Sequence, residues 1–153
     1  MNASASPKPV WVPTPPGPVL KAFGEEVSIL LTGEQTDGKL TLWLESVPPG
    51  GGPPPHRHLR EEEWFVVQEG RFEFLLEGTW KEMKPGGVAY IPRNAVHTFR
   101  NCGDTTGKLL VSTSPSGFET IFQRSADKFS KPGEPNMEAI LKVASEHGIE
   151  FVT

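Results

Sequence analysis

Apolar and polar residues alternate along the middle of this chain with the period of two that half-buried β-strands show. The alternation begins at Val27 and returns in short runs as far as Thr113, and the Glu-Gly pairs at 69–70 and 77–78 mark tight turns between runs. Further strands are expected at 63–68, 72–76, 80–84, 88–91, 96–100 and 108–113. Short strands with no helices between them predict an all-β barrel or sandwich.

The two ends of the chain differ from this middle part. Six of the first 18 residues are proline, which predicts an irregular arm over residues 1–18. Its apolar anchor is expected at 10–12, lying across its own barrel or across a neighbouring subunit. The barrel itself is expected over residues 19–115. Apolar residues at helical spacing then predict two helices in a C-terminal segment, residues 116–153, packed on the barrel.

Composition narrows the possible functions. A chain of 153 residues suits one domain, and its net charge of −4 offers no basic surface to a phosphate backbone, so nucleic-acid binding is not expected. No apolar run reaches the roughly 18 residues of a membrane-spanning helix, and the proline-rich N-terminus does not resemble a signal peptide. Cys102 is the only cysteine, and it has no cationic neighbour in sequence to activate its thiol. A cytoplasmic protein with no membrane partner is therefore expected.

The placement of the four histidines carries the chemistry of this sequence. His56 and His58 are two residues apart, so on a strand both imidazoles point to the same face. Glu63 opens the next apolar strand, and His97 opens a later one. Three neutral imidazoles and one carboxylate suit one divalent transition metal ion, which is Fe, Mn, Co, Ni, Cu or Zn, whereas Mg²⁺ and Ca²⁺ prefer more oxygen ligands.

Two further residues could be confused with the four ligands, namely Glu62 and His147. Glu63 shares its strand face with the apolar positions that follow it, but it lies in a run of three glutamates, and Glu62 remains an alternative ligand. His147 is expected at the C-terminus of the second helix, where the helix dipole favours a positive charge, and not at the metal.

The spacing of these residues resembles the two motifs of the cupin superfamily. The first motif consists of a glycine, an H-x-H pair, a glutamate and a second glycine. Every spacing in it matches, at Gly50, His56, His58, Glu63 and Gly70. The second motif is matched by Gly86, Pro92, His97 and Asn101. Asn94 departs from this pattern, since the family usually has a glycine there, but asparagine tolerates a left-handed backbone better than other side chains do.

The resemblance implies a jelly-roll barrel, also described as a double-stranded β-helix, in a small single-domain cupin similar to quercetin dioxygenases. It implies that His56, His58, Glu63 and His97 hold the metal. In such relatives the metal binds a flavonol-type enolate and O₂ cleaves the ring. A metal-dependent dioxygenase acting on a small aromatic or enolisable substrate is therefore expected. Glu63 is in addition the candidate catalytic residue, as a general base.

Two other classes of function stay open. The first is metal-assisted chemistry without O₂, carried out by an isomerase, a decarboxylase or a lyase. The second is the binding of a small molecule without catalysis. Turnover in the absence of O₂ would favour the first of these, and a metal without an accessible open coordination position would favour the second.

A homodimer is also expected. Trp43, Trp64 and Val66 are predicted on strand faces opposite the barrel lining, and they leave apolar surface to be covered. A second copy of the chain would cover it.

Overall fold

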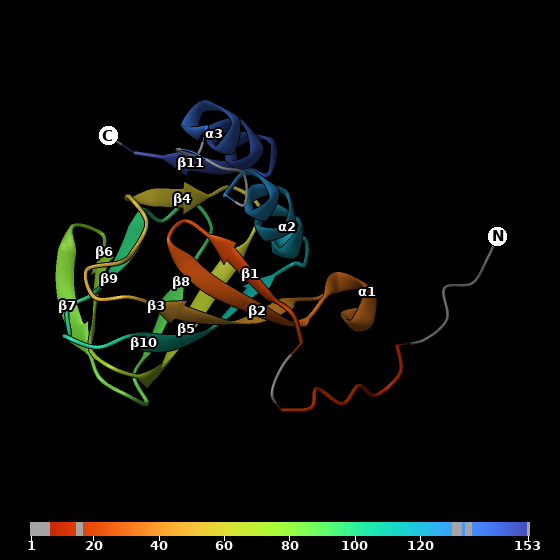
Figure 1. The fold of residues 1–153 in the computed structure, drawn as a ribbon, viewed down its shortest axis with the longest axis horizontal. Coiled ribbons are helices and arrows are strands. Elements are labelled where there is room, and N and C mark those ends of the chain that lie inside the picture. Colours follow the sequence, from red (N-terminus) through yellow and green to blue (C-terminus); the bar gives the residue numbers. More distant parts are fainter. Residues whose placement is uncertain (1–6, 15–16, 130–132, 134–135, 153) are drawn as a thin grey trace.

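The structure, a computed structural model, describes residues 7–14, 17–129, 133 and 136–152. Its strands form two antiparallel sheets, with two helices at one end of them (Figure 1). The six-stranded sheet has the order β1 (Val19–Ala22), β2 (Glu25–Leu31), β3 (Thr41–Val47), β10 (Gly107–Ser114), β5 (Glu62–Glu69) and β8 (Val88–Ile91). The five-stranded sheet has the order β11 (Ile149–Phe151), β4 (His56–His58), β9 (His97–Asn101), β6 (Phe72–Leu76) and β7 (Thr79–Met83). The prediction of an all-β barrel followed by two C-terminal helices is confirmed.

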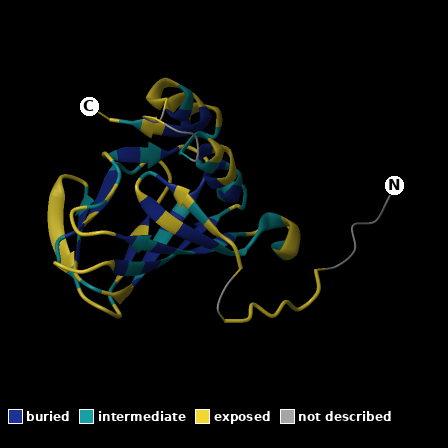
Figure 2. Cartoon of the chain, in the orientation of Figure 1, coloured by how far each residue is buried: buried dark blue, intermediate teal, exposed yellow. Residues whose placement is uncertain are grey.

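Strand β5 shows how the alternating sequence builds the core. Glu63, Phe65 and Val67 are buried on its inner face, while the residues between them are only partly buried. Buried and less buried segments alternate along the strands of the barrel (Figure 2). Phe65 meets Phe99 of the opposite sheet with ring centroids 5.5 Å apart. Aromatic rings from both sheets therefore fill the space between them and hold the two inner faces together.

Strand β3 corrects the expected orientation of Trp43. The side chain lies on the buried inner face together with Glu45, and only 1% of Trp43 is exposed. Its indole stacks on Phe118, the first residue of α2 (Phe118–Phe129), with ring centroids 5.1 Å apart. The outward assignment of Trp43 is wrong because the alternating leucines of β3 resemble a core face. In the structure the space beneath α2 is filled by the larger aromatic ring.

The C-terminal elements close one end of the barrel. α2 packs on β1, α3 (Met137–Glu146) packs on α2 and β11, and β11 pairs with β4. The Glu119 carboxylate accepts hydrogen bonds from Gly33 N at 2.8 Å, from Gly117 N at 3.0 Å and from the Thr41 hydroxyl. This carboxylate joins the start of α2 to β3 and to the short helix α1 (Gly33–Thr36).

Three elements were not expected from the sequence, namely β1, α1 and β11. Each has only three or four residues, which is too few to show a period. A capping box fixes α1, because the Thr32 hydroxyl accepts from Gln35 N while Thr32 N donates to the Gln35 side chain. β11 covers the edge of β4 that would otherwise present unpaired backbone groups.

Residues 7–14 of the N-terminal arm contain no helix or strand and extend away from the barrel (Figure 1). Trp11 is 94% exposed, so this part of the arm has no apolar anchor on its own barrel. Contact between the arm and a neighbouring subunit stays a prediction. In the part of the chain that the structure describes, no helix has the length and apolar character needed to cross a membrane.

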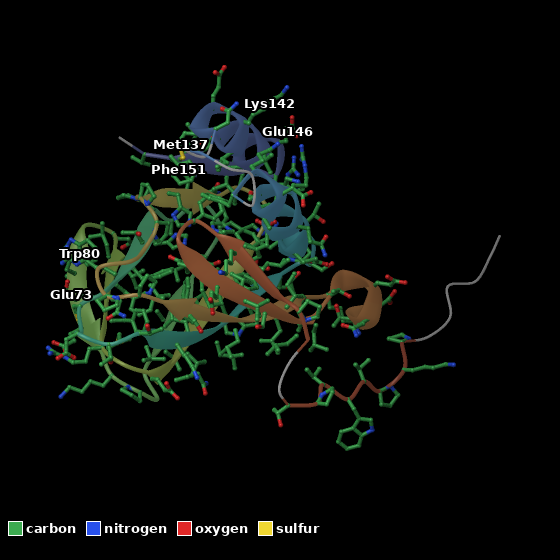
Figure 3. The ribbon with its side chains drawn as sticks, in the orientation of Figure 1. Glu73, Trp80, Met137, Lys142, Glu146 and Phe151 are labelled. Atoms are coloured by element: carbon green, nitrogen blue, oxygen red, sulfur yellow. The ribbon has the colours of Figure 1, made fainter. Side chains whose placement is uncertain are left out.

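The outer face of the five-stranded sheet is polar. Glu73 and Trp80 lie at this side of the molecule (Figure 3). Arg100 of β9 forms an ion pair with Glu73 and places its guanidinium carbon 4.9 Å from the centroid of the Trp80 ring. Exposed pairs of this kind contribute little stability. They indicate a face that stays in contact with water.

Two carboxyl groups are buried inside the barrel. Glu25 of β2 and Glu45 of β3 are 6% and 5% exposed, and they are diagonal neighbours because Val27 pairs with Glu45 across the two strands. Burial, the charge of Glu45 and a hydrogen bond with Glu45 together raise the pKa of Glu25 to about 12. Burial raises the pKa of Glu45 as well. The pair therefore holds at least one proton at neutral pH.

This pair makes the stability of the fold depend on pH. Between its ordinary pKa of 4.5 and its folded value of about 12, Glu25 keeps a proton in the folded chain and loses it in the unfolded chain. The free energy of unfolding must then fall as pH rises, by up to about 1.4 kcal/mol per pH unit for one proton. We expect Glu25→Gln to make the decline between about pH 6 and 8 less steep, as measured by denaturant unfolding of the metal-free protein.

Glu26→Gln is the matched control, because Glu26 is the next residue of β2 and is exposed. It should leave the pH dependence of unfolding as it is in the wild type. Equal slopes in wild type and Glu25→Gln would show that the Glu25 proton is not linked to folding.

Candidate metal centre

Three imidazoles and one carboxylate converge between the two sheets. One ligand atom from each of His56, His58, Glu63 and His97 lies within 4.8 Å of those from the other three, and all four side chains are buried. The histidines come from β4 and β9 of the five-stranded sheet, and Glu63 comes from β5 of the six-stranded sheet. The structure thus brings together every residue that the sequence placed in the metal site.

Strand register explains why the side chains meet. His56 and His97 are direct partners across β4 and β9, and His58 points to the same face of β4 as His56 because it is two residues further on. The turn before β9 contains Asn94 in the left-handed conformation, at φ 71°. Asn94 N donates a hydrogen bond of 2.8 Å to the His58 carbonyl, which ties this turn to β4. The expectation that asparagine can replace the family's glycine here is confirmed.

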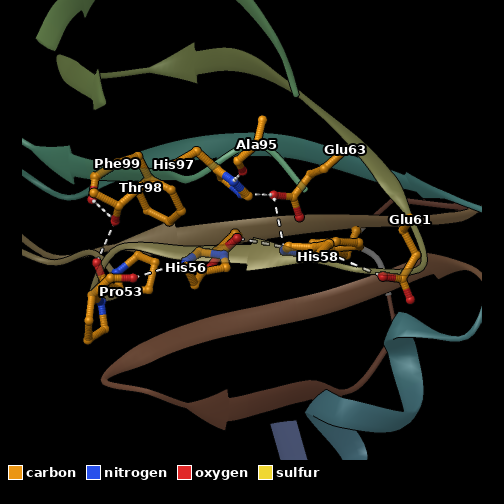
Figure 4. A network of polar contacts seen from close by, with 12 residues as sticks. Pro53, His56, His58, Glu61, Glu63, Ala95, His97, Thr98 and Phe99 are labelled. Carbon is orange, nitrogen blue, oxygen red and sulfur yellow. Dashed lines mark hydrogen bonds and ion pairs between the residues drawn. The ribbon is translucent and has the colours of Figure 1, made fainter. Parts of the chain in front are cut away.

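Each histidine has an acceptor near its Nδ1 atom, on the side away from the cluster (Figure 4). His56 Nδ1 lies 3.0 Å from the Pro54 carbonyl oxygen and His97 Nδ1 lies 2.9 Å from that of Ala95. His58 Nδ1 lies 3.5 Å from a carboxylate oxygen of Glu61, which is an ion-pair distance without a hydrogen bond. The carbonyl acceptors at His56 and His97 hold Nδ1 protonated and leave Nε2 as the free lone pair, which is the arrangement that metal-binding histidines show.

The distances inside the cluster are close to those around one small cation. Glu63 Oε1 lies 2.9 Å from His97 Nε2 and 3.7 Å from His58 Nε2. Two ligand atoms that are each about 2.1 Å from one ion are about 3.0–3.4 Å apart at octahedral or tetrahedral angles, so the first distance is slightly shorter than this range and the second is slightly longer. His58 Nε2 is buried and has no hydrogen-bond partner among the described residues. A divalent ion would satisfy that atom, so the residues present fit a metal.

The protonation states of His56 and Glu63 are those that bind a cation, whereas His58 tends to hold a proton. Burial, and after it the neighbouring imidazoles of His97 and His58, lower the pKa of His56 to about 4, so His56 is neutral at physiological pH. Burial alone would raise the pKa of Glu63, but His58 and His97 outweigh it and lower the pKa, so Glu63 is a carboxylate. Burial lowers the pKa of His58, yet Glu63 and Glu61 raise it by more. A proton on His58 therefore has to leave when an ion binds.

The three consecutive glutamates have three different environments. Glu63 joins the histidines, whereas Glu62 is half-buried and pairs with Arg93 at 2.9 Å, so the alternative assignment of the ligand to Glu62 is not supported. Glu61 is 5% exposed and faces His58. A role for Glu61 was not predicted, because a run of charges usually lies in solvent. Its spacing of three residues from His58 was the available signal.

His147 lies outside the cluster, as expected. It occupies the C-cap position of α3, and its Nε2 lies 3.1 Å from a guanidinium nitrogen of Arg124.

A cavity of about 80 Å³ adjoins the cluster. This is several times the space of about 10–15 Å³ that one water molecule needs. Most of its wall is apolar and comes from the barrel, from α2 and α3, and from β11. Phe118 of α2 stacks on the His58 ring with centroids 5.2 Å apart and an interplanar angle of 12°. The C-terminal elements therefore shield the histidines from bulk water.

Comparison with known proteins agrees with this geometry. The family model described as Cupin domain matches residues 43–113. A quercetin 2,3-dioxygenase of Bacillus subtilis is 28% identical over 110 residues, which cover 65% of this chain and 32% of that protein. Matches to three curated relatives span 32%, 50% and 62% of the relatives' own lengths, so this chain corresponds to only part of each.

Solved structures give the same result. A protein described as a predicted oxalate decarboxylase of Thermotoga maritima has a TM-score of 0.58 and 25% identity, covering 60% of this chain and 80% of that one. A polyketide cyclase of Streptomyces resistomycificus has a TM-score of 0.55 and 28% identity, covering 62% of this chain and 68% of that one. The two facing sheets, the two sequence motifs and the His₃Glu cluster agree with these matches, and the chain belongs to the cupin superfamily.

Proposed function

We propose that this protein is a metal-dependent enzyme in which His56, His58, Glu63 and His97 bind one divalent transition metal ion. The reaction that we favour is the dioxygenation of a small aromatic or enolisable substrate. The observation that carries the proposal is the orientation of the three histidines. Carbonyl acceptors lie at Nδ1 of His56 and His97, and a carboxylate oxygen of Glu61 lies 3.5 Å from Nδ1 of His58. Nε2 of His58 and of His97 faces the Glu63 carboxylate.

A bound divalent ion would supply a Lewis-acidic centre whose net positive charge attracts an enolate or phenolate oxygen. Glu63 is the candidate to take the proton from an incoming hydroxyl group, because it lines the cavity and is ionised. Phe118 and Phe122 line the cavity and exclude water from this proton transfer. Both roles use side chains of this chain alone.

Two lines of support point to different reactions. The similarity to the Bacillus subtilis quercetin 2,3-dioxygenase favours dioxygenation. The similarity to structures described as a predicted oxalate decarboxylase and a polyketide cyclase favours metal-assisted chemistry without O₂ as the second candidate. The barrel scaffold does not choose between them, because one fold carries many reactions.

We also propose that two copies associate through the outer face of the six-stranded sheet. A row of apolar residues crosses four of its strands: Leu44, Leu110, Val66 and Val88. Val88 and Tyr90 on the edge strand β8 are 56% and 58% exposed. A contiguous apolar face of this kind favours association, in contrast to the polar outer face of the other sheet. A cytoplasmic location fits the single cysteine.

Metal binding by this site is tested by substitution. We expect one divalent ion per chain, measured by calorimetric titration with Co²⁺ or Ni²⁺ and by metal analysis. His58→Ala should weaken binding by more than about 100-fold, because it removes a ligand, and Glu61→Gln should weaken it by about 10- to 100-fold. His147→Ala is the control and should bind like the wild type. Unchanged affinity in His58→Ala would contradict the assignment.

The reaction class is tested by O₂ uptake. Protein loaded separately with Fe²⁺, Mn²⁺, Co²⁺, Ni²⁺ or Cu²⁺ is mixed with flavonols and with small enolisable acids in an oxygen-electrode cell. We expect O₂ consumption in step with substrate loss, and a decrease of about 10²- to 10⁴-fold in Glu63→Gln if Glu63 is the general base. Turnover without O₂ would support the second candidate, and binding without turnover would reduce the protein to a small-molecule-binding module.

The dimer is tested by light scattering. We expect a mass of about twice the 16.8 kDa of one chain at micromolar concentration. Val88→Lys should shift the mass toward one chain, whereas Trp80→Lys, on the polar outer face, should not. A wild-type mass of 16.8 kDa would refute the dimer.

A further inference from the structure

The cavity beside the metal centre has a second polar wall. Glu25 and Glu45 line the same cavity as His56 and Glu63. Along the inner face of the six-stranded sheet, the row that contains Trp43 and Phe65 separates Glu45 from Glu63. A ligand in the cavity therefore lies between two polar ends, with aromatic walls between them.

The existing hydrogen bonds of Glu25 and Glu45 determine whether this second wall can donate or accept further ones. Trp43 Nε1 donates a hydrogen bond of 3.1 Å to Glu45 Oε2, so Glu45 acts as an acceptor. Burial raises the pKa of both carboxyl groups, and the two share a hydrogen bond, so the proton of the pair lies between them. The one proton of the pair is therefore already engaged in the hydrogen bond between the two carboxyl groups. Toward a ligand, the pair can only accept hydrogen bonds.

One of these acceptors has no protein partner. Glu25 Oε1 is fully buried and receives no hydrogen bond from any described residue. Glu25 as a whole is 6% exposed, so bulk water does not replace the missing donor. No lysine or arginine among the described residues forms an ion pair with Glu25 or Glu45. Burying carboxyl groups without such compensation costs stability. A pair that only supported the fold would gain from replacement by apolar residues of similar size.

We propose that Glu25 and Glu45 form a hydrogen-bond-accepting subsite that selects ligands with a hydroxyl group at the end remote from the metal. This proposal rests on the proposed function, because the metal centre has to hold the other end of the ligand. A hydroxyl group donates to the free acceptor of the pair. An apolar end leaves that acceptor unsatisfied, and a carboxylate end is repelled by the negative charge that the two carboxyl groups share.

The substrate class follows from these two ends. It is a small ring or enol that presents an anionic oxygen to the metal and a neutral hydroxyl group to the carboxyl pair. Dicarboxylic acids do not fit, because their second carboxylate would meet Glu45.

Three hydroxypyranones that share a metal-binding end test this subsite. Kojic acid carries a hydroxymethyl group at the remote position, allomaltol carries a methyl group there, and comenic acid carries a carboxylate. Their dissociation constants are measured by calorimetry with Co²⁺-loaded protein and are corrected by the affinity of each compound for free Co²⁺. We expect kojic acid to bind about tenfold more tightly than allomaltol and comenic acid to bind most weakly.

Variants of similar size tie the preference to the two residues. Glu25→Met removes the free acceptor and should reduce the ratio between kojic acid and allomaltol to less than about threefold. Glu45→Gln removes the charge of the pair and should improve the relative binding of comenic acid. Glu26→Gln, exposed on the same strand, should keep the wild-type order. If one of the buried variants does not fold, the other variant and the wild-type order still decide.

The failures of the two proposals look different. If wild-type protein binds Co²⁺ and all three compounds with equal corrected affinity, or if the preference for kojic acid persists in Glu25→Met, the subsite is wrong and the metal centre stands. If Co²⁺ does not bind, or if no compound changes the visible absorption of the bound Co²⁺, the proposed function fails and this inference fails with it.

Discussion

The convergence of three imidazoles and one carboxylate between two sheets is the constraint on which the rest of the site depends. Four ionisable side chains are buried there, and His58 Nε2 has no hydrogen-bond partner among the described residues. Burying such groups costs several kcal/mol for each unpaired charge, unless a partner compensates it. One divalent cation would compensate all four. The site is therefore expected to be more stable with the ion than without it.

The barrel and the C-terminal elements α2, α3 and β11 contribute differently to this centre. The strands set the direction of the ligand side chains, because the pairing of β4 with β9 brings His56 opposite His97 and β5 presents Glu63 from the other sheet. The C-terminal elements enclose the ligands, since Phe118 stacks on His58 and β11 pairs with β4, the strand that carries two of the histidines. A single chain thus supplies both the ligands and the low-polarity environment that strengthens electrostatic interactions at the centre.

The sequence predicted those parts of the structure that depend on periodicity and motif spacing. The strands from β5 to β10 follow the alternation of apolar residues, and the four members of the cluster follow the two cupin motifs. Contacts between distant elements could not be predicted. Trp43 seemed to face outward because the alternating leucines of β3 resemble a core face, and only the packing of α2 shows why the larger ring is inside.

The same limit applies to the polar residues that surround the site. Glu61 appeared to belong to a solvated run of charges, and Glu45 appeared as a polar position in a strand whose leucines seemed to form the core. Their burial results from strand pairing and from the helical cover, neither of which leaves a local signal in the sequence. β11, with three residues, has no period to detect. Residues outside the motifs therefore needed the structure before a role could be assigned to them.

The most direct test of the central claim is anomalous diffraction from crystals grown with Co²⁺ or Zn²⁺. One strong peak is expected between the sheets, about 2.0–2.2 Å from the imidazole nitrogens of His56, His58 and His97 and from a carboxylate oxygen of Glu63. A peak at a surface carboxylate instead, or imidazoles turned away from a common point, would contradict the account.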